Sequence, residues 1–128
     1  KIPELDAITK CFYLDHLSDG ISLRMAYSAS DVFALPSKLD NLPLTVMEAQ
    51  SCNTPVVLFR MSGQQDLIVD EDSGFSIEPF DTIAFGKALL EILKVQKIRQ
   101  PRRHILNKNN ENVIANSYTE LYSEILKK

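Results

Sequence analysis

The sequence predicts an α/β fold in which a parallel sheet is covered by helices on both faces. Short apolar segments alternate along the chain with longer segments that have helical periodicity. The apolar segments have almost no polar residues in their middles, which is typical of strands buried on both faces. A chain of 128 residues suits a single domain with one core, so we assign residues 1–128 to one domain.

Composition excludes several classes of protein. Hydrophobic residues make up 45% of the chain and charged residues 24%, which is ordinary for a globular protein. The net charge of -3 gives no global reason to expect nucleic-acid binding. Cys11 and Cys52 lack CxxC spacing, so a reducing compartment is expected rather than a disulfide framework. No apolar run approaches the roughly 20 residues that would span a membrane.

The first part of the chain is expected to contain two strands and two helical segments. Residues 2–10 resemble the end of a helix, from which we expect the chain to be a piece of a longer polypeptide. Residues 11–16 are an aromatic and apolar strand candidate, and the turn LSDG follows them. Residues 21–30 are expected to form a helix, and residues 31–37 a buried strand.

The middle of the chain continues this alternation. Residues 43–52 are expected to form a helix with Pro43 at its first position, where the missing N–H costs nothing. Asn53 can adopt the left-handed conformation that ends helices. Residues 56–59 are a third strand candidate, and one helical turn is expected within residues 64–68.

The last part is expected to hold a short strand and two helices. Residues 75–78 are the strand candidate, and residues 112–126 are expected to form the final helix. Asp81 is expected to cap the helix between them. The apolar face of that helix is predicted to consist of Ile83, Ala84, Ala88, Leu89 and Ile92.

Two acids mark the most informative segment, DNLPLTVMEAQSCNTPVV. In parallel α/β sheets, ligands bind beyond the carboxyl ends of the strands, and Asp40 lies in a loop at such an end. The unpaired N–H groups of the next helix, near Leu44 and Thr45, favour an anion such as a phosphate. Glu48 lies one turn further on. The spacing therefore fits a diphosphate with hydroxyls on either side, but it also fits ordinary turn chemistry and a solvated helix face.

Four segments together resemble a known family. SDVFALPS, DNLPLTVMEAQSCNTPVV, SGQQDLI and SGFSIEPFD follow one another with short spacings. They resemble the C-terminal, nucleotide-sugar-binding domain of family 4 (group 1) glycosyltransferases, which have the GT-B fold. The signature of that family is two acids separated by seven residues, then a small-residue helix end and a Pro-Val-Val strand. The resemblance covers about residues 11–126 and implies a Rossmann-like domain that is incomplete at its N-terminus.

The resemblance implies that the two acids are the candidate catalytic residues. Glu48 would bind the ribose hydroxyls of the donor, and Asp40 would meet hydroxyls of the transferred sugar. The loop around Asp15 and His16 would lie near the base.

Main-chain groups of the same motif would complete the donor site. The backbone N–H groups of Leu42 and Leu44 would face the sugar, and Thr45 would face the phosphates. The terminal helix, with Tyr118 and Tyr122, matches the segment that packs back towards the partner domain.

Three departures from the family pattern bear on activity. Asp40 stands where the family usually has Glu, and Asn53 stands where it usually has Gly. No segment matches the upstream Arg and Lys that neutralise the diphosphate. The 128 residues alone are therefore expected to be inactive without the N-terminal acceptor domain.

The function that the resemblance implies is retaining transfer of a hexose from a UDP-sugar or GDP-sugar to a saccharide or lipid-linked acceptor. No metal or other cofactor is expected. The setting would be bacterial surface polysaccharide synthesis in the cytoplasm, with peripheral contact at the inner face of the plasma membrane. The alternatives are a non-catalytic module that binds a nucleotide or a protein partner, and a sugar-nucleotide epimerase of the same fold.

Two further charged segments need an interpretation. Asp70, Glu71 and Asp72 resemble a metal-binding Asp-x-Asp motif, but their place before Ser-Gly indicates an exposed acidic turn. His104 is expected at the surface. The basic residues that follow the predicted helix form either a solvated surface or a contact with anionic lipid. They are Lys94, Lys97, Arg99, Arg102, Arg103 and Lys108.

Overall fold

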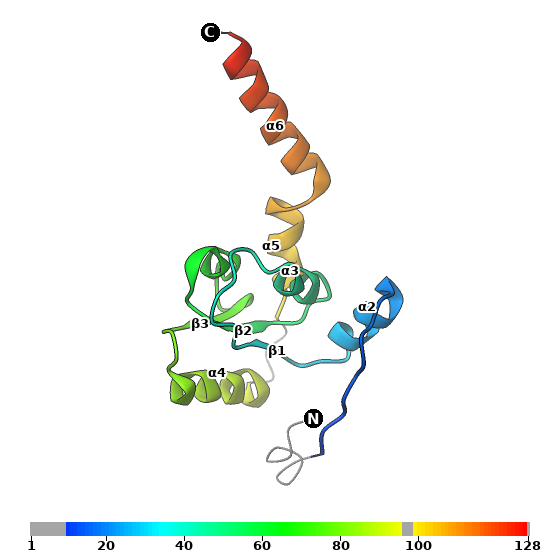
Figure 1. Cartoon of the computed structure of the whole chain (residues 1–128), viewed down its shortest axis with the longest axis vertical. Coiled ribbons are helices and arrows are strands. Elements are labelled where there is room, and N and C mark those ends of the chain that lie inside the picture. The colour runs from blue at the N-terminus through cyan, green and yellow to red at the C-terminus, as the bar shows by residue number, and fades with distance from the viewer. Residues whose placement is uncertain (1–9, 96–98, 128) are drawn as a thin grey trace.

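The computed structural model of the chain describes residues 10–95 and 99–127. The helix end expected at residues 2–10 lies almost wholly outside the described residues, as does Lys97. The elements, in chain order, are α2 (Gly20–Ser28), β1 (Phe33–Leu35), α3 (Leu44–Ser51), β2 (Val56–Phe59), the 3-10 helix η1 (Ser62–Leu67), β3 (Gly74–Ile77), α4 (Thr82–Lys94), α5 (Pro101–Lys108) and α6 (Glu111–Leu126) (Figure 1).

The three strands form one parallel sheet in the order β1-β2-β3. Val56 on the central strand pairs with Phe33 on one side and with Gly74 on the other. All four residues of β2 are buried. The predicted parallel sheet is therefore confirmed, but the prediction of a buried strand within residues 31–37 is wrong. In β1, Phe33 and Leu35 are only partly buried and Ala34 is exposed, because β1 lies at one edge of the described sheet.

The core lies on both faces of β2, because successive side chains of a strand point to opposite faces. One cluster joins Val56 and Leu58 to Val46, Ala49 and Leu67. The other cluster joins Val57 and Phe59 to Phe85, Ala88 and Ile92. Figure 1 shows the consequence, with α3 on one side of the sheet and α4 on the other.

Most of the predicted apolar face of α4 is confirmed, because Ala88 and Ile92 are buried and Leu89 packs against the core, but Ile83 is not part of that face. Its buried residues are Phe85, Ala88 and Ile92, whereas Ile83 is 72% exposed. The prediction left out Phe85, whose large ring buries more apolar surface than the side chain of Ile83 and fixes the rotation of the helix. The predicted cap is confirmed, since the Asp81 carboxylate accepts a hydrogen bond from the Ala84 N–H at 2.8 Å.

Two other predictions need correction, and one helix was not predicted. Residues 11–16 form no strand, because a strand needs a hydrogen-bonded neighbour and none of the described strands pairs with this segment. Pro43 is the N-cap of α3 in an extended conformation rather than its first helical residue. The helix α5 was not predicted, although Pro101 occupies its first turn as helix-start statistics favour. Asn53 has the predicted left-handed conformation, with φ of 67°.

The two last helices, α5 and α6, do not pack on the described sheet. The helix α5 packs on α3, and α6 extends away from the rest of the described chain (Figure 1). The Asn110 side chain caps α6 by accepting hydrogen bonds from the N–H groups of Asn112 and Val113. None of the helices in the described ranges has the length and apolar character needed to cross a membrane.

The backbones of β3 and β2 approach each other closely at Gly74. A Cβ built on Gly74 would lie 1.8 Å from the Val56 carbonyl oxygen, and the φ of Gly74 is +130°. We expect Gly74→Ala to lower the free energy of unfolding by at least about 3 kcal/mol, measured by urea denaturation.

The matched control is Gly86→Ala in α4, where an added Cβ meets nothing within 4 Å. This control should raise the free energy of unfolding by about 0.5–1 kcal/mol, because alanine favours a helix interior. A Gly74→Ala variant as stable as the wild-type chain would contradict this packing.

Candidate functional site

The candidate site lies at the carboxyl edge of the sheet, where β1 leads into the loop before α3. The same edge carries η1, which follows β2. A Cβ on Gly63 of η1 would lie 2.8 Å from the Asn41 carbonyl oxygen, so the two connections touch closely. The loop that carries Asp40 therefore packs directly against η1.

The N-terminus of α3 has no side-chain cap. Pro43 offers no polar side-chain atom, whereas Asp81 and Asn110 cap α4 and α6. The first N–H groups of a helix have no partner inside the helix and favour an anion. Leu44 and Thr45, which open α3, are exposed. This end of α3 can therefore receive an anionic group.

The core holds α3 in place from the opposite side. Val46 and Ala49 are buried, and so is Gln50, whose side-chain amide donates to the Leu67 carbonyl at 2.9 Å. Because these residues face inwards, Glu48 is left on the exposed side of the helix. The packing of α3 against the core thus sets which side of the helix carries Glu48.

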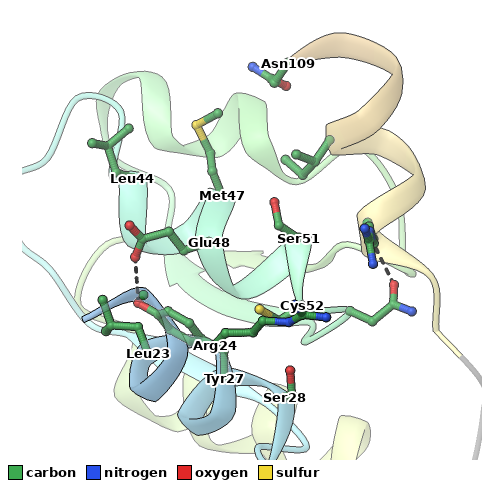
Figure 2. Close-up of a pocket in the computed structure, with 14 residues that line it drawn as sticks. Leu23, Arg24, Tyr27, Ser28, Leu44, Met47, Glu48, Ser51, Cys52 and Asn109 are labelled. Carbon is green, nitrogen blue, oxygen red and sulfur yellow. Dashed lines mark hydrogen bonds between the residues drawn. The ribbon is translucent and has the colours of Figure 1, made fainter. Parts of the chain in front are cut away.

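Glu48 has a partner on a neighbouring helix. The Tyr27 hydroxyl donates a hydrogen bond to Glu48 Oε2 at 3.1 Å (Figure 2). Burial, together with this hydrogen bond and the charge of Glu48, raises the pKa of Tyr27 to about 12. Tyr27 is therefore a neutral donor at any physiological pH.

Glu48 and Tyr27 line a groove of about 640 Å³ between α2, α3 and α5 (Figure 2). The groove is polar at several points, with Arg24 and Arg102 among its lining side chains. Its lining residues are Gly20, Leu23, Arg24, Tyr27, Ser28, Leu44, Met47, Glu48, Ser51, Cys52, Asn53, Arg102, Ile105 and Asn109. Such a groove offers hydrogen-bond donors and acceptors beside apolar surface, as ligand sites do.

The structure brings some of the predicted site residues together and not others. Leu44 and Glu48 line the groove, and Thr45 is exposed on the same turn of α3. Thr45 does not line the groove, and neither do four other predicted residues. Asp40 is partly buried in the loop before α3, Leu42 is exposed in that loop, and Asp15 and His16 are exposed in the segment before α2.

Sequence reasoning did not find the contribution of α2 and α5 to this groove. Leu23 and Tyr27 lie four residues apart, so helical spacing places them on one face of α2. That spacing was the available signal for Tyr27. Nothing comparable pointed to Arg102, because α5 itself was not predicted.

The acidic turn has a structural role within the described residues. Asp70 accepts hydrogen bonds from the N–H and hydroxyl of Ser73, and it pairs with His104 Nε2 at 2.6 Å. Partial burial raises the pKa of Asp70, but the Ser73 hydrogen bonds and His104 outweigh burial, so this pKa lies below its usual value. His104 is partly buried and joins α5 to this turn through its contact with Asp70, rather than lying free at the surface.

Comparison with known proteins places this geometry among sugar transferases. The profile of the family described as "Glycosyl transferases group 1" matches residues 2–113. An Escherichia coli UDP-Gal:alpha-D-GlcNAc-diphosphoundecaprenol alpha-1,3-galactosyltransferase is 36% identical over 90 residues, which cover 70% of this chain and 22% of that protein. The Staphylococcus aureus capsular polysaccharide biosynthesis glycosyltransferase CapM is 25% identical over 119 residues, covering 89% of this chain and 30% of that protein.

A solved structure agrees with the predicted fold. Sucrose-phosphate synthase from Thermosynechococcus elongatus superposes with a TM-score of 0.81 and 25% identity, covering 98% of this chain and 32% of that one. The predicted Rossmann-like fold of a GT-B C-terminal domain is confirmed. The chain spans between 22% and 32% of the lengths of these three proteins.

The pKa of Tyr27 provides a test of the Glu48 contact. Tyr27 should titrate near pH 12 in the wild-type chain. In Glu48→Ala the pKa should fall, because the hydrogen bond and the negative charge are both lost. The measurement is a ¹³C NMR titration of the tyrosine ring carbons, with Tyr27→Phe to assign the signal and Glu91→Ala on α4 as the control.

The raised pKa of Tyr27 also predicts how the stability of the fold depends on pH. Because the folded-state pKa of Tyr27 lies above the usual value of 10.0, its contribution to stability is complete below about pH 10 and is lost as pH rises towards 12. A Tyr27 pKa that stays the same in Glu48→Ala would show that Glu48 does not hold this hydroxyl.

Proposed function

Because this chain belongs to the group 1 glycosyl transferases, we propose that it binds the nucleoside diphosphate sugar from which a larger enzyme transfers a hexose. The observation that carries this proposal is Glu48, an exposed carboxylate beside the uncapped end of α3 in a groove of about 640 Å³. A carboxylate accepts hydrogen bonds from paired sugar hydroxyls, and an uncapped helix end accepts a phosphate.

In the proposed complex, each part of the donor has its own contact. The ribose hydroxyls donate to Glu48, and the diphosphate lies against the N–H groups of Leu44 and Thr45. Asp40 and the Leu42 N–H meet hydroxyls of the transferred sugar. The base extends towards the segment that contains Asp15 and His16, which precedes α2.

The proposed reaction is transfer of the sugar to an acceptor hydroxyl with retention of configuration. Negative charge that develops on the leaving diphosphate is stabilised by helix N–H groups, and cations from outside residues 1–128 complete that stabilisation. An N-terminal domain supplies the acceptor site. No metal ion takes part in this proposed mechanism.

The names of the relatives suggest the substrate class. The Escherichia coli relative is named for UDP-Gal and a diphosphoundecaprenol-linked acceptor, and the Staphylococcus aureus relative for capsular polysaccharide biosynthesis. We therefore favour a UDP-sugar over a GDP-sugar as donor, and a lipid-linked or saccharide acceptor in bacterial surface polysaccharide synthesis. The enzyme would work in the cytoplasm, with basic residues such as Arg103 and Lys108 near the inner face of the membrane.

An amide NMR titration of the 128-residue chain with UDP and with GDP tests this proposal. The expected shifts are at residues 44–48, they are larger with UDP, and they disappear in Glu48→Ala. Binding in the millimolar range is expected, since the cations proposed to neutralise the diphosphate are not among residues 1–128. The control variant, Glu91→Ala, removes an exposed carboxylate from α4 and should bind as the wild-type chain does.

Nucleotide binding that is unaffected by Glu48→Ala would contradict the proposal. Binding without transfer activity in the longest natural form of the protein would instead favour a nucleotide-binding module without turnover. A sugar-nucleotide epimerase would be recognised by conversion of the donor in the absence of any acceptor.

A further inference from the structure

We propose that Tyr27 is a positioning residue for nucleotide binding, because its hydroxyl holds the Glu48 carboxylate in the orientation that receives the ribose hydroxyls. This inference rests on the proposed function, in which Glu48 is the acid that binds ribose. The two side chains come from different helices, 21 positions apart in the sequence, and meet at 3.1 Å in the wall of the groove (Figure 2).

Glu48 needs such a restraint because its side chain is exposed and has several rotatable bonds. A free glutamate side chain loses conformational entropy when a ligand fixes it, and that loss weakens binding. Within residues 10–95 and 99–127, the Tyr27 hydroxyl donates the hydrogen bond to this carboxylate, and no ion pair competes for it. The hydrogen bond from Tyr27 therefore orients the Glu48 carboxylate before a ligand binds.

The geometry leaves room for the ligand. An ionised carboxylate has about four lone-pair sites on its two oxygens. The Tyr27 hydroxyl uses one site on Oε2, which leaves Oε1 and the rest of Oε2 for the two neighbouring hydroxyls of a ribose. A neutral donor also leaves the negative charge of Glu48 in place, whereas a guanidinium would occupy both oxygens.

Tyr27 is itself held by the core. Its carbonyl accepts hydrogen bonds from the Thr54 hydroxyl at 2.6 Å and from the Ser30 N–H at 3.0 Å. Its ring meets the Phe33 ring edge-on, with centroids 5.5 Å apart and planes at 88°. Thr54 is 2% exposed, so this anchor is shielded from water. Contacts with Phe33 and Thr54 thus fix the position of Tyr27, and the Tyr27 hydroxyl in turn restrains the Glu48 carboxylate.

The variant Tyr27→Phe tests the proposal, because it removes the hydroxyl and keeps the ring against Phe33. The affinities of the 128-residue chain for UDP and 2′-deoxy-UDP, and for GDP and 2′-deoxy-GDP, would be measured by amide NMR titration. We expect Tyr27→Phe to weaken ribonucleotide binding about three- to tenfold and deoxyribonucleotide binding much less. The preference for the ribonucleotide should therefore shrink.

The matched control is Tyr118→Phe on α6, whose tyrosine is 56% exposed and does not line the groove. It should leave all affinities unchanged. A urea denaturation curve for each variant reports whether the fold is retained.

The outcomes separate the two proposals. An equal loss of affinity for ribo- and deoxyribonucleotides in Tyr27→Phe, or no loss at all, overturns the positioning role. When Glu48→Ala abolishes binding and Tyr27→Phe leaves it unchanged, only the positioning role fails. Binding that survives Glu48→Ala, or that is absent from the wild-type chain with both nucleotides, overturns the proposed function and the role of Tyr27 with it.

Discussion

The burial of β2 on both faces is the constraint on which the rest of the structure depends. Val56 and Leu58 pack towards α3, and Val57 and Phe59 pack towards α4, all with at most 5% exposure. Complete burial of such side chains contributes about 1.5–3 kcal/mol each relative to exposure. Both layers of helices are therefore tied to one strand of four residues. The parallel register then fixes which edge of the sheet carries the loop with Asp40 and the start of α3.

The helix α3 combines apolar residues that pack into the core with an exposed acid, Glu48. Val46 and Ala49 lie in the core, and Gln50 ties the helix to the end of η1. Glu48 lies between these inward-facing positions but on the other side of the helix, beside Leu44. Apolar burial thus stabilises the helix and presents the carboxylate at the same time. The helix α2 adds Tyr27 to the same wall, so the donor site that we propose is built from the helix before β1 and the helix that connects β1 to β2.

The parts of the fold that followed from sequence were those set by local pattern. The run 56–59 could be assigned because a continuous apolar segment after Asn53 and Pro55 has few alternatives. The cap at Asp81 and the left-handed Asn53 depend on neighbours within a few residues. Residues 11–16 look equally strand-like, yet strand formation depends on a pairing partner that their own sequence does not reveal.

The candidate site was only half predictable for the same reason. The acids Asp40 and Glu48 could be proposed as site residues because their spacing is local. Tyr27 was missed because its contact with Glu48 spans 21 positions and depends on how α2 crosses α3. On α4 only Ile83 was wrongly included and Phe85 left out, because helical spacing alone does not show which of these two residues packs against the sheet.

The central claim is that Glu48 is the ribose-binding acid at the uncapped end of α3. A crystal structure of this chain with UDP tests that claim most directly. The account predicts both ribose hydroxyls within hydrogen-bond distance of the Glu48 carboxylate, the Tyr27 hydroxyl still on Oε2, and the diphosphate against the N–H groups of Leu44 and Thr45. A structure in which UDP lies elsewhere, with Glu48 bonded to Tyr27 alone, would contradict it.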